Sequence, residues 1–320
     1  MPKHLIHLLV VLLFVSCKKK SIKSSYTDYS ITEDVQLNKI VSIGNKLIIV
    51  GGERFYKARM YSLENNTVSL IPLPSSTTNK EIYGIDISSN GGLFAVGFDA
   101  SIYTSNDSGL NWNFIQDQSW KEFQSIAFRD ADSAFIVGGY GFEKGLLVRT
   151  NKEGGSDIQL REEQNFELTD IEFVTSSIGY CSGYGAILKT IDGGQHWNFT
   201  SAKNDFYKAM SWKNTTEGVA VGFNGSIIKT TDGGDTWNTI RNGNQFLKKK
   251  CRFLDIAFNQ QGIYAAVGEK GCIIISKNEG ETWSELESFT KNDLRGVCFK
   301  NQQTIVVVGT NGTIAEVILP

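Results

Sequence analysis

Four short segments of this chain share one pattern, Ser/Thr-x-Asp/Asn-x-Gly-x-x-Trp, and each follows a run of β-forming residues. These segments, called boxes below, cover residues 105–112, 190–197, 230–237 and 276–283. The first two boxes are 85 residues apart, about two repeats, and the later spacings are 40 and 46 residues. A repeat of this length built from short strands is typical of a β-propeller blade. The boxes therefore predict the architecture before they say anything about function.

Extending the alignment outward from the boxes gives a unit of four strands, A to D, with the box in the C–D hairpin. Glycine supplies the positive φ that a tight hairpin needs, and the Asp carboxylate accepts hydrogen bonds from nearby backbone N–H groups. The units at 38–74 and 122–164 lack a box, and the last unit stops before the position of one. The pattern predicts seven units, at residues 38–74, 81–118, 122–164, 167–203, 205–245, 251–288 and 293–320.

The last unit, residues 293–320, has strands A, B and C but no strand D. Residues 26–35 form the unassigned β-like segment that precedes the first unit. We predict that this segment supplies the missing outer strand, which closes the ring and removes two exposed sheet edges. The alternative is a linker without regular structure. The expected fold is all-β: one seven-bladed propeller of four-stranded antiparallel blades over residues 26–320, closed by an N-terminal strand.

The N-terminus, residues 1–16, resembles a bacterial lipoprotein signal peptide. A charged start precedes an apolar run at 5–15, which is too short to span a bilayer, and a small residue then precedes Cys17. Phe14 stands where leucine is more usual. We expect Cys17 to be lipidated and residues 17–25 to be a tether, so that the protein is anchored to a bacterial membrane at the cell envelope, on the periplasmic side or at the cell surface. The alternatives are an ordinary signal peptide or a short anchor.

Four further cysteines follow this segment, at Cys181, Cys251, Cys272 and Cys298. Three of them fall inside predicted strands where other units carry alanine or serine. We therefore predict small, buried packing residues. The alternative is a disulfide between Cys272 and Cys298, which an exported protein could form between neighbouring blades.

The boxes resemble the Asp-box (BNR) repeat, and the wider pattern resembles the Ycf48/Hcf136 group of propellers, named for photosystem II assembly factors. Residues 219–237 carry the resemblance most clearly, and they recur with drift at 179–197 and 264–283. The resemblance covers about residues 80–318 and extends more weakly over residues 38–74. In that family the boxes are structural, which implies turn-forming carboxylates and tryptophans packed between blades. The residues concerned are Asp107, Trp112, Asp192, Trp197, Asp232, Trp237, Asn278 and Trp283.

The resemblance implies a binding or assembly-helper role, in some members beside membrane complexes. We therefore expect a non-catalytic scaffold with a protein partner, such as a membrane complex, and a lipid anchor. The net charge of −2 gives no general affinity for nucleic acid. No cofactor and no metal are expected.

Several kinds of enzyme are disfavoured by the residues themselves. Only His196 lies outside the signal segment, and it stands inside a box, so a Ser-His-Asp triad and a multi-histidine metal site both lack their residues. No phosphate-binding glycine loop occurs. Sialidases share the Asp-box, but their Phe/Tyr-Arg-Ile-Pro motif is missing, and Arg54 and Arg59 lie outside that context. The alternative function is a glycan-binding or glycoside-hydrolysing propeller, which would need paired carboxylates.

The D–A and B–C loops of a propeller emerge on one face, and here they are rich in aromatic and basic residues. Exposed aromatic side chains rimmed by charge favour a contact surface. The alternative is that Phe98, Tyr184 and Phe223 fold inward and plug the channel mouth. The candidate partner-binding residues are Phe98, Trp120, Tyr140, Tyr184, Phe223, Lys248, Lys249, Lys250, Arg252, Lys270 and Arg295.

Overall fold

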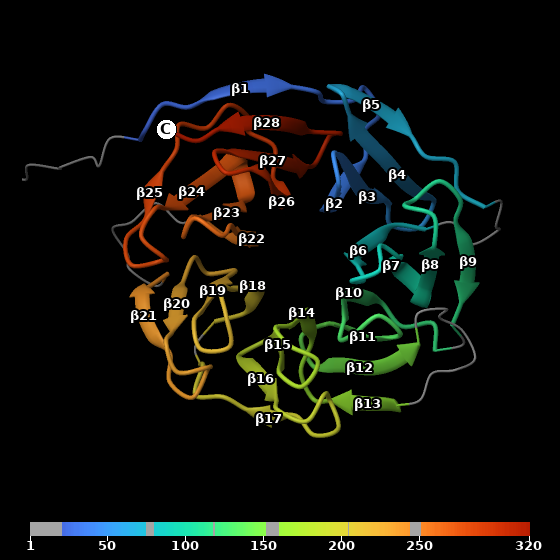
Figure 1. The fold of residues 1–320 in the computed structure, drawn as a ribbon, viewed down its shortest axis with the longest axis vertical. Coiled ribbons are helices and arrows are strands. Elements are labelled where there is room, and N and C mark those ends of the chain that lie inside the picture. The colour runs from blue at the N-terminus through green and yellow to red at the C-terminus, as the bar shows by residue number, and fades with distance from the viewer. Residues whose placement is uncertain (1–20, 75–79, 118, 152–159, 204, 244–250) are drawn as a thin grey trace, which may run out of the picture.

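The computed structural model of this chain describes residues 21–74, 80–117, 119–151, 160–203, 205–243 and 251–320. Seven sheets of four antiparallel strands stand around a central axis (Figure 1). The predicted all-β, seven-bladed architecture is confirmed. Among the described residues no helix is long and apolar enough to cross a membrane.

The first six blades are simple meanders, in which consecutive strands pair from the channel outward. Blade 1 consists of β2 (Gln36–Ile43), β3 (Lys46–Glu53), β4 (Lys57–Glu64) and β5 (Thr67–Leu70). Blade 2 consists of β6 (Ile82–Ile87), β7 (Leu93–Gly97), β8 (Ser101–Ser105) and β9 (Asn113–Gln116). Blade 3 consists of β10 (Phe123–Phe128), β11 (Ser133–Tyr140), β12 (Lys144–Asn151) and β13 (Leu160–Gln164).

Blades 4 to 6 repeat this order. Blade 4 consists of β14 (Leu168–Phe173), β15 (Gly179–Gly183), β16 (Ala186–Thr190) and β17 (Asn198–Phe199). Blade 5 consists of β18 (Tyr207–Trp212), β19 (Gly218–Gly222), β20 (Ile227–Thr230) and β21 (Asn238–Arg241). Blade 6 consists of β22 (Phe253–Phe258), β23 (Tyr264–Gly268), β24 (Cys272–Ser276) and β25 (Ser284–Glu285). Short 3₁₀ turns, Phe98–Ala100 and Glu269–Gly271, join the second and third strands of blades 2 and 6.

The seventh blade combines the two ends of the chain. Its sheet has the order β1-β28-β27-β26, from β1 (Ser25–Asp28), β28 (Ile314–Ile318), β27 (Thr304–Gly309) and β26 (Leu294–Asn301). Strand β1 runs antiparallel to β28 on the outer rim, with Tyr26 opposite Val317 (Figure 1). Strand β1 takes only the first part of the segment at 26–35, and the remainder continues toward blade 1.

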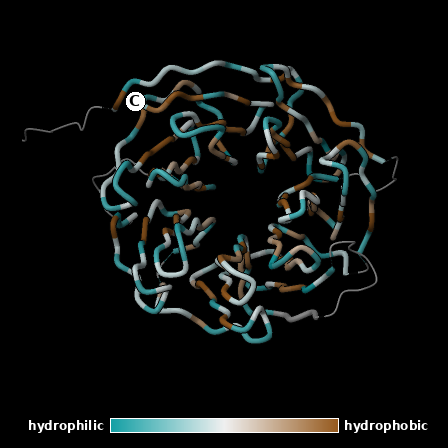
Figure 2. Tube along the Cα trace, viewed as in Figure 1, coloured by the Kyte–Doolittle hydropathy of each residue, from teal (hydrophilic) through white to brown (hydrophobic). Residues whose placement is uncertain are grey.

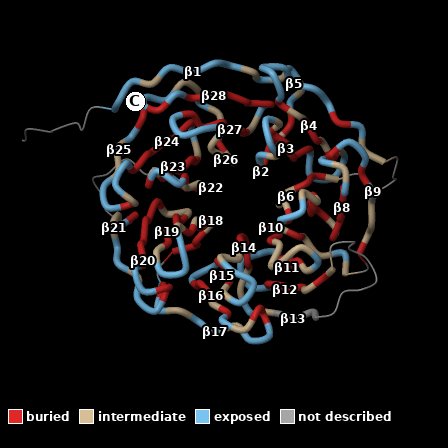
Figure 3. Tube along the Cα trace, in the orientation of Figure 1, coloured by how far each residue is buried: buried red, intermediate tan, exposed pale blue. Residues whose placement is uncertain are grey.

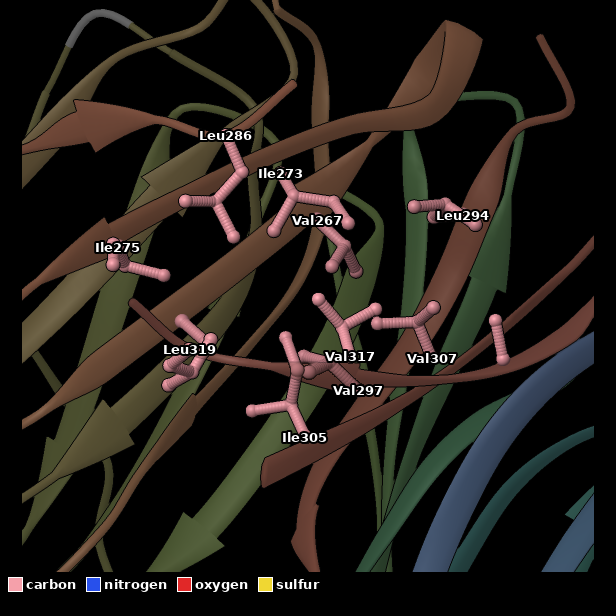
Figure 4. Close-up of a cluster of buried hydrophobic side chains, with 12 residues drawn as sticks. Val267, Ile273, Ile275, Leu286, Leu294, Val297, Ile305, Val307, Val317 and Leu319 are labelled. Carbon is pink, nitrogen blue, oxygen red and sulfur yellow. The ribbon is translucent and has the colours of Figure 1, made fainter. Parts of the chain in front are cut away.

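The core lies between neighbouring blades. The second strand of blade 2, β7, is buried at every position, because the adjacent blades cover both faces of its sheet. Apolar stretches recur in every blade, and the buried residues concentrate in the second and third strands, as in β7, β8, β23 and β24 (Figures 2 and 3). The cluster in Figure 4 joins side chains of blade 6, such as Ile273, to side chains of blade 7, such as Val317.

The disulfide is a correction to the sequence analysis. Cys251 and Cys272 are bonded, with their Cα atoms 6.0 Å apart, while Cys298 carries a free thiol and Cys181 is buried in β15. The alternative Cys272–Cys298 pairing is therefore wrong, and Cys272 is not a free packing residue. The bond forms because the connection that leads into blade 6 brings Cys251 beside the first residue of β24.

Candidate partner-binding face and central channel

Each box folds into a turn whose acidic or amide side chain binds its own backbone. In the box at 230–237, Asp232 Oδ1 accepts a hydrogen bond from Thr236 N at 2.9 Å and from the Thr230 hydroxyl at 2.8 Å. The Thr230 hydroxyl oxygen also accepts from Gly234 N at 2.8 Å. Gly233 and Gly234 have φ of 72° and 87°, a left-handed conformation that favours glycine.

The other three boxes repeat these contacts. Asp107 and Asp192 accept N–H groups from Asn111 and His196, at 2.9 and 3.0 Å, and Asn278 Oδ1 accepts Thr282 N at 2.9 Å. The amide of Asn278 thus makes the backbone contact that aspartate makes elsewhere.

These hydrogen bonds also favour the charged form of each carboxylate. The Asn111 backbone N–H lowers the pKa of Asp107 to about 2, and the Thr236 hydroxyl lowers the pKa of Asp232 to about 2. None of the box acids lines either cavity of the central channel. The carboxylates lie in separate hairpins, so they do not form a common site.

The box tryptophans pack across the boundaries between blades. Trp112 joins a cluster with Ile48 of blade 1, and Trp197 lies 6.1 Å from the ring of Phe135 in blade 3. Trp237 contacts Trp212 within blade 5, in a cluster that includes Tyr180 of blade 4. Trp283 packs in the cluster shared by blades 5 and 6. These contacts explain why each box ends in a large aromatic residue.

Replacing Asp232 tests the turn role. We expect Asp232→Ala to lower the Tm by a few degrees, because several hydrogen bonds within one turn are lost, and Asp232→Asn to lower it less, since Asn278 performs the same task naturally. Asp235→Ala is the control, because Asp235 lies in the same hairpin and contacts Lys189 only at the exposed surface. Thermal unfolding followed by circular dichroism measures all three. Equal losses for Asp232→Ala and Asp235→Ala would contradict a turn-forming role.

Four aromatic side chains, Phe142, Tyr184, Phe206 and Phe223, form a continuous group on the D–A/B–C face of blades 3 to 5, and together with the neighbouring Tyr140 they are here called the aromatic arc. Ring centroids lie 5.1 Å apart for Phe142 and Tyr184, 5.6 Å for Phe142 and Phe206, and 6.4 Å for Phe206 and Phe223. Tyr140 is the fifth member, on the same loop as Phe142. Tyr140, Phe142 and Tyr184 are 48%, 51% and 51% exposed. Large aromatic surface is thus presented to solvent at neighbouring loop tips.

Backbone contacts between loops hold the arc in place. Phe142 has a φ of 65°, in a region where bulky residues are strained. Two hydrogen bonds with Glu167 hold its backbone in this conformation. Its N–H donates to Glu167 Oε2 at 3.1 Å, and its carbonyl accepts Glu167 N at 3.2 Å. Phe223 N donates to Phe206 O at 2.8 Å, and Tyr184 bridges to Phe206. The exposed rings therefore stand on a rigid frame.

Basic side chains border the arc. The Lys144 ammonium lies 5.6 Å from the ring of Tyr140, and the Lys208 ammonium lies 4.5 Å from the ring of Phe206. The Arg252 guanidinium lies 4.9 Å from the ring of Phe223. These are cation–π distances. Lys144 and Arg252 lie over the end rings of the arc, Tyr140 and Phe223, whereas Lys208 lies over the central ring of Phe206 and also lines the channel.

The innermost strand of every blade contains a β-bulge near its start, at the third residue of β2 and at the second residue of the other six strands, which turns that side chain into the channel. All seven bulge residues line a small cavity of about 80 Å³ at the D–A/B–C end of the channel. They are Asn38, Tyr83, Gln124, Thr169, Lys208, Leu254 and Arg295.

Beyond the bulge, alternation along the strands places two further layers of side chains in the channel. In the middle layer, Lys39, Gly84, Ser125, Asp170 and Asp255 line the small cavity. The layer nearer the box face is Val41, Asp86, Ala127, Glu172, Ser211, Ala257 and Cys298, and all seven of its members line a larger cavity of about 510 Å³.

The family model described as "Photosynthesis system II assembly factor YCF48" matches residues 151–246 and, in a second overlapping match, residues 202–300. The matched stretch contains three of the four boxes. The chain is a Ycf48-like BNR propeller. No curated protein is similar enough in sequence to count as a relative.

Solved structures share the fold of this Ycf48-like propeller at low sequence identity. A streptogramin B lyase is 11% identical, with 93% of this chain and 98% of that chain covered and a TM-score of 0.74. A catalytically inactive virginiamycin B lyase from Staphylococcus aureus, solved with quinupristin, is 12% identical, with 93% and 100% covered and a TM-score of 0.72. YCF48 bound to D1 peptide is 16% identical over 78% of this chain and 96% of that chain, but its TM-score is only 0.47. The two lyases show the fold alone.

The predicted face residues of the Ycf48-like propeller fall into different environments. Tyr140, Tyr184 and Phe223 belong to the arc, whereas Phe98 is only 8% exposed, because Phe55 packs against its ring at 5.1 Å. Trp120 is 58% exposed, on the loop before blade 3. Phe55 and Tyr56 were not among the predicted face residues, although the loop after Gly52 repeats the glycine-then-aromatic pattern of the other tips.

The basic candidates also separate. Arg252 is exposed beside Phe223, and Lys270 is exposed in blade 6. Arg295 instead lines the small channel cavity, where its Nε donates to Asn38 Oδ1 at 2.7 Å. Lys248, Lys249 and Lys250 lie outside the described residues, as does Cys17.

Four channel carboxylates of the Ycf48-like propeller tie neighbouring blades together at three junctions, between blades 2 and 3, 4 and 5, and 6 and 7. Each accepts a hydrogen bond from a backbone N–H group of the following blade. Asp86 accepts from Phe128 at 2.8 Å, and Asp170 accepts from Met210 at 2.9 Å. Glu172 accepts from Trp212 at 3.3 Å, and Asp255 accepts from Val297 at 2.9 Å. Asp255 also pairs with Lys39 at 2.6 Å. These acids therefore serve the fold by joining the inner strands of successive blades.

Proposed function

We propose that this Ycf48-like propeller is a non-catalytic scaffold that binds a protein partner through the aromatic arc. The exposed rings of Tyr140, Phe142 and Tyr184 are the observation that carries the proposal. Contiguous aromatic surface of this kind marks protein-binding sites, where buried aromatic side chains supply most of the binding energy. The description of the matching family as an assembly factor supports the same role.

The channel chemistry supports a non-catalytic role. The acids that a glycosidase would need are the ones that accept backbone N–H groups between inner strands, as Asp86 and Asp170 do. Among the described residues, no group of three or more His, Cys, Asp or Glu side chains is arranged to hold a metal ion. The rigid loops of the arc, by contrast, suit binding without a large loss of conformational entropy.

We also propose that the scaffold is held at the cell envelope by a lipid on Cys17. The signal-like sequence of residues 1–16 supports this anchor. Ile22, in the second half of the proposed tether, is bound to the outer rim of blade 6, where its N–H donates to Glu285 O at 2.9 Å. A tether that leaves from the rim keeps the arc accessible to a partner.

Site-specific photocrosslinking in the native host tests the binding face. A photoreactive phenylalanine analogue at Tyr184 should give one discrete crosslinked protein, because the side chain lies at the centre of the arc. The same analogue at Gln195, exposed on the box face, is the matched control and should give none. Phe142→Ala should reduce the Tyr184 crosslink about tenfold, as expected for loss of a hot-spot ring.

Equal crosslinking from Tyr184 and Gln195, or a Tyr184 crosslink that is insensitive to Phe142→Ala, would contradict the proposal. Hydrolysis of a glycan panel by the purified protein, lost in Asp170→Asn, would favour the glycoside-hydrolysing alternative instead. The anchor is tested separately by metabolic labelling with a lipid analogue, which Cys17→Ser should abolish.

A further inference from the structure

The larger channel cavity lies toward the box face, away from the aromatic arc. The last residues of several inner strands line it, such as Ile87, Phe128 and Phe258. Its volume of about 510 Å³ falls within the range of small-molecule sites, roughly 300–1,000 Å³. This cavity has no part in the partner binding proposed above.

The room in this cavity comes from the residues that the inner strands present there. Ala127, Ser211, Ala257 and Cys298 are small, so four of the seven blades contribute little bulk at this level. Asp86 and Glu172 project from two of the remaining blades. The cavity therefore combines open space, small apolar patches and two carboxylates at one depth of the channel.

The charges of the lining are unequal. Lys39 is the one cationic side chain among the lining residues, and its ammonium is engaged by Asp255 at 2.6 Å. Asp86, Asp170 and Glu172 face the same space, each positioned by a backbone N–H of the next blade. When these acids are ionised, negative charge is in excess in a partly enclosed site, where electrostatic interactions are stronger than in bulk water.

We propose that this cavity binds a small organic ammonium ion, with its positive charge between Asp86 and Glu172 and its alkyl groups against Val41, Ala127 and Ala257. An anion would be repelled by the carboxylates of Asp86, Asp170 and Glu172. A divalent metal ion would need a cluster of closely spaced ligands, and the described residues contain no such group. An ammonium ion needs only opposite charge and apolar contact, and the cavity offers both.

Titration of the lining acids provides an independent signature. Burial raises the pKa of Asp86 to about 6, and burial together with the charge of Asp170 raises the pKa of Glu172 to about 8. Burial also raises the pKa of Asp170 and brings that of the Cys298 thiol to about 12. Burial opposes the charge of Lys39, but Asp255 and Asp170 together raise its pKa above the usual value. The cavity therefore becomes more negative as the pH rises from about 6 to about 8.

Isothermal titration calorimetry with choline tests the proposal, because the choline charge does not change with pH. The matched neutral probe is 3,3-dimethylbutan-1-ol, in which carbon replaces the ammonium nitrogen. We expect choline to bind at least about tenfold more tightly than the alcohol, and its affinity to rise about tenfold between pH 6 and pH 8. The alcohol should show no such rise.

Two isosteric variants locate the site. Asp86→Asn and Glu172→Gln should each weaken choline binding about tenfold, while Glu287→Gln, at an exposed position, should leave it unchanged. Thermal unfolding checks that each variant is folded. If one of the two variants does not fold, the other still tests the site. Equal affinity for choline and the alcohol, absence of choline binding, or displacement of choline by an equal concentration of potassium chloride would each overturn the proposal.

Discussion

Deleting residues 1–35 should lower the free energy of unfolding by on the order of 5 kcal/mol, whereas deleting residues 1–20 should leave it unchanged. The difference lies in the segment that begins with β1 and runs over the outer side of blade 7. Four residues of β1 pair with β28, and two further N–H groups, of Tyr29 and Ile31, donate to Ile314 O and Gly312 O. These contacts join the beginning of the chain to its end.

The side chains after β1 explain the size of the effect. Val35 is fully buried, and Tyr29 and Ile31 pack against the same cluster, which also contains residues of blades 1 and 7. Burying an aliphatic or aromatic side chain contributes about 1.5–3 kcal/mol. Glu33 adds an ion pair to Arg59 at 2.7 Å, and hydrogen bonding from Arg59 lowers the pKa of Glu33 to about 2. The segment thus links blade 7 to blade 1.

Urea unfolding followed by tryptophan fluorescence measures both truncations. The longer truncation also uncovers the edge of β28, so size-exclusion chromatography should show larger species, because an unpaired strand edge invites association. Identical unfolding midpoints for the two truncations would show that the ring does not depend on this segment.

The blades and the boxes were predictable from the sequence because their interactions are local. A box carboxylate such as Asp232 accepts hydrogen bonds from groups within four residues of itself, so one short segment of sequence determines the turn. The strands alternate with glycine-rich turns at a regular interval, and each blade buries its faces only against its neighbours. A repeat of such units specifies a ring without any knowledge of distant contacts.

The channel was not predictable in the same way. The side chains that face it depend on a bulge at the start of each inner strand, and a register shift of one residue would move Asp86 and Glu172 out of the cavity. The burial of Phe98 similarly depends on Phe55, which comes from another blade. Sequence spacing within a unit does not contain this information.

The arc was partly predictable, since aromatic residues at the tips of glycine-bounded loops indicate exposure. Tyr140 and Tyr184 are exposed as such positions suggest, but the contacts that assemble the arc are set by loops from three different blades. The position of Phe142 depends on Glu167 from the next blade. Recognition surfaces of this kind emerge only when the blades are placed side by side.

Breaking the Cys251–Cys272 disulfide should lower the free energy of unfolding by about 3 kcal/mol, because the bond closes a loop of 21 residues and restricts the unfolded chain. The bond also lies next to Arg252, which covers one end of the aromatic arc at Phe223. Urea unfolding with and without dithiothreitol should show this difference in the wild-type protein. A Cys251→Ala/Cys272→Ala variant should unfold like the reduced wild type and show no response to the reductant.

Cys298→Ala is the matched control, because Cys298 carries a free thiol and its replacement keeps the disulfide. This variant should retain the full response to dithiothreitol. A wild-type protein whose unfolding midpoint is the same in both conditions would contradict the stabilising role of the bond. This pairing was not predicted because a separation of 21 residues carries no sign of contact. The two sulfur atoms meet in the folded blade, where Cys251, just before β22, lies beside the first residue of β24. For a contact that belongs to the completed blade, we expect the loss to speed unfolding more than it slows folding.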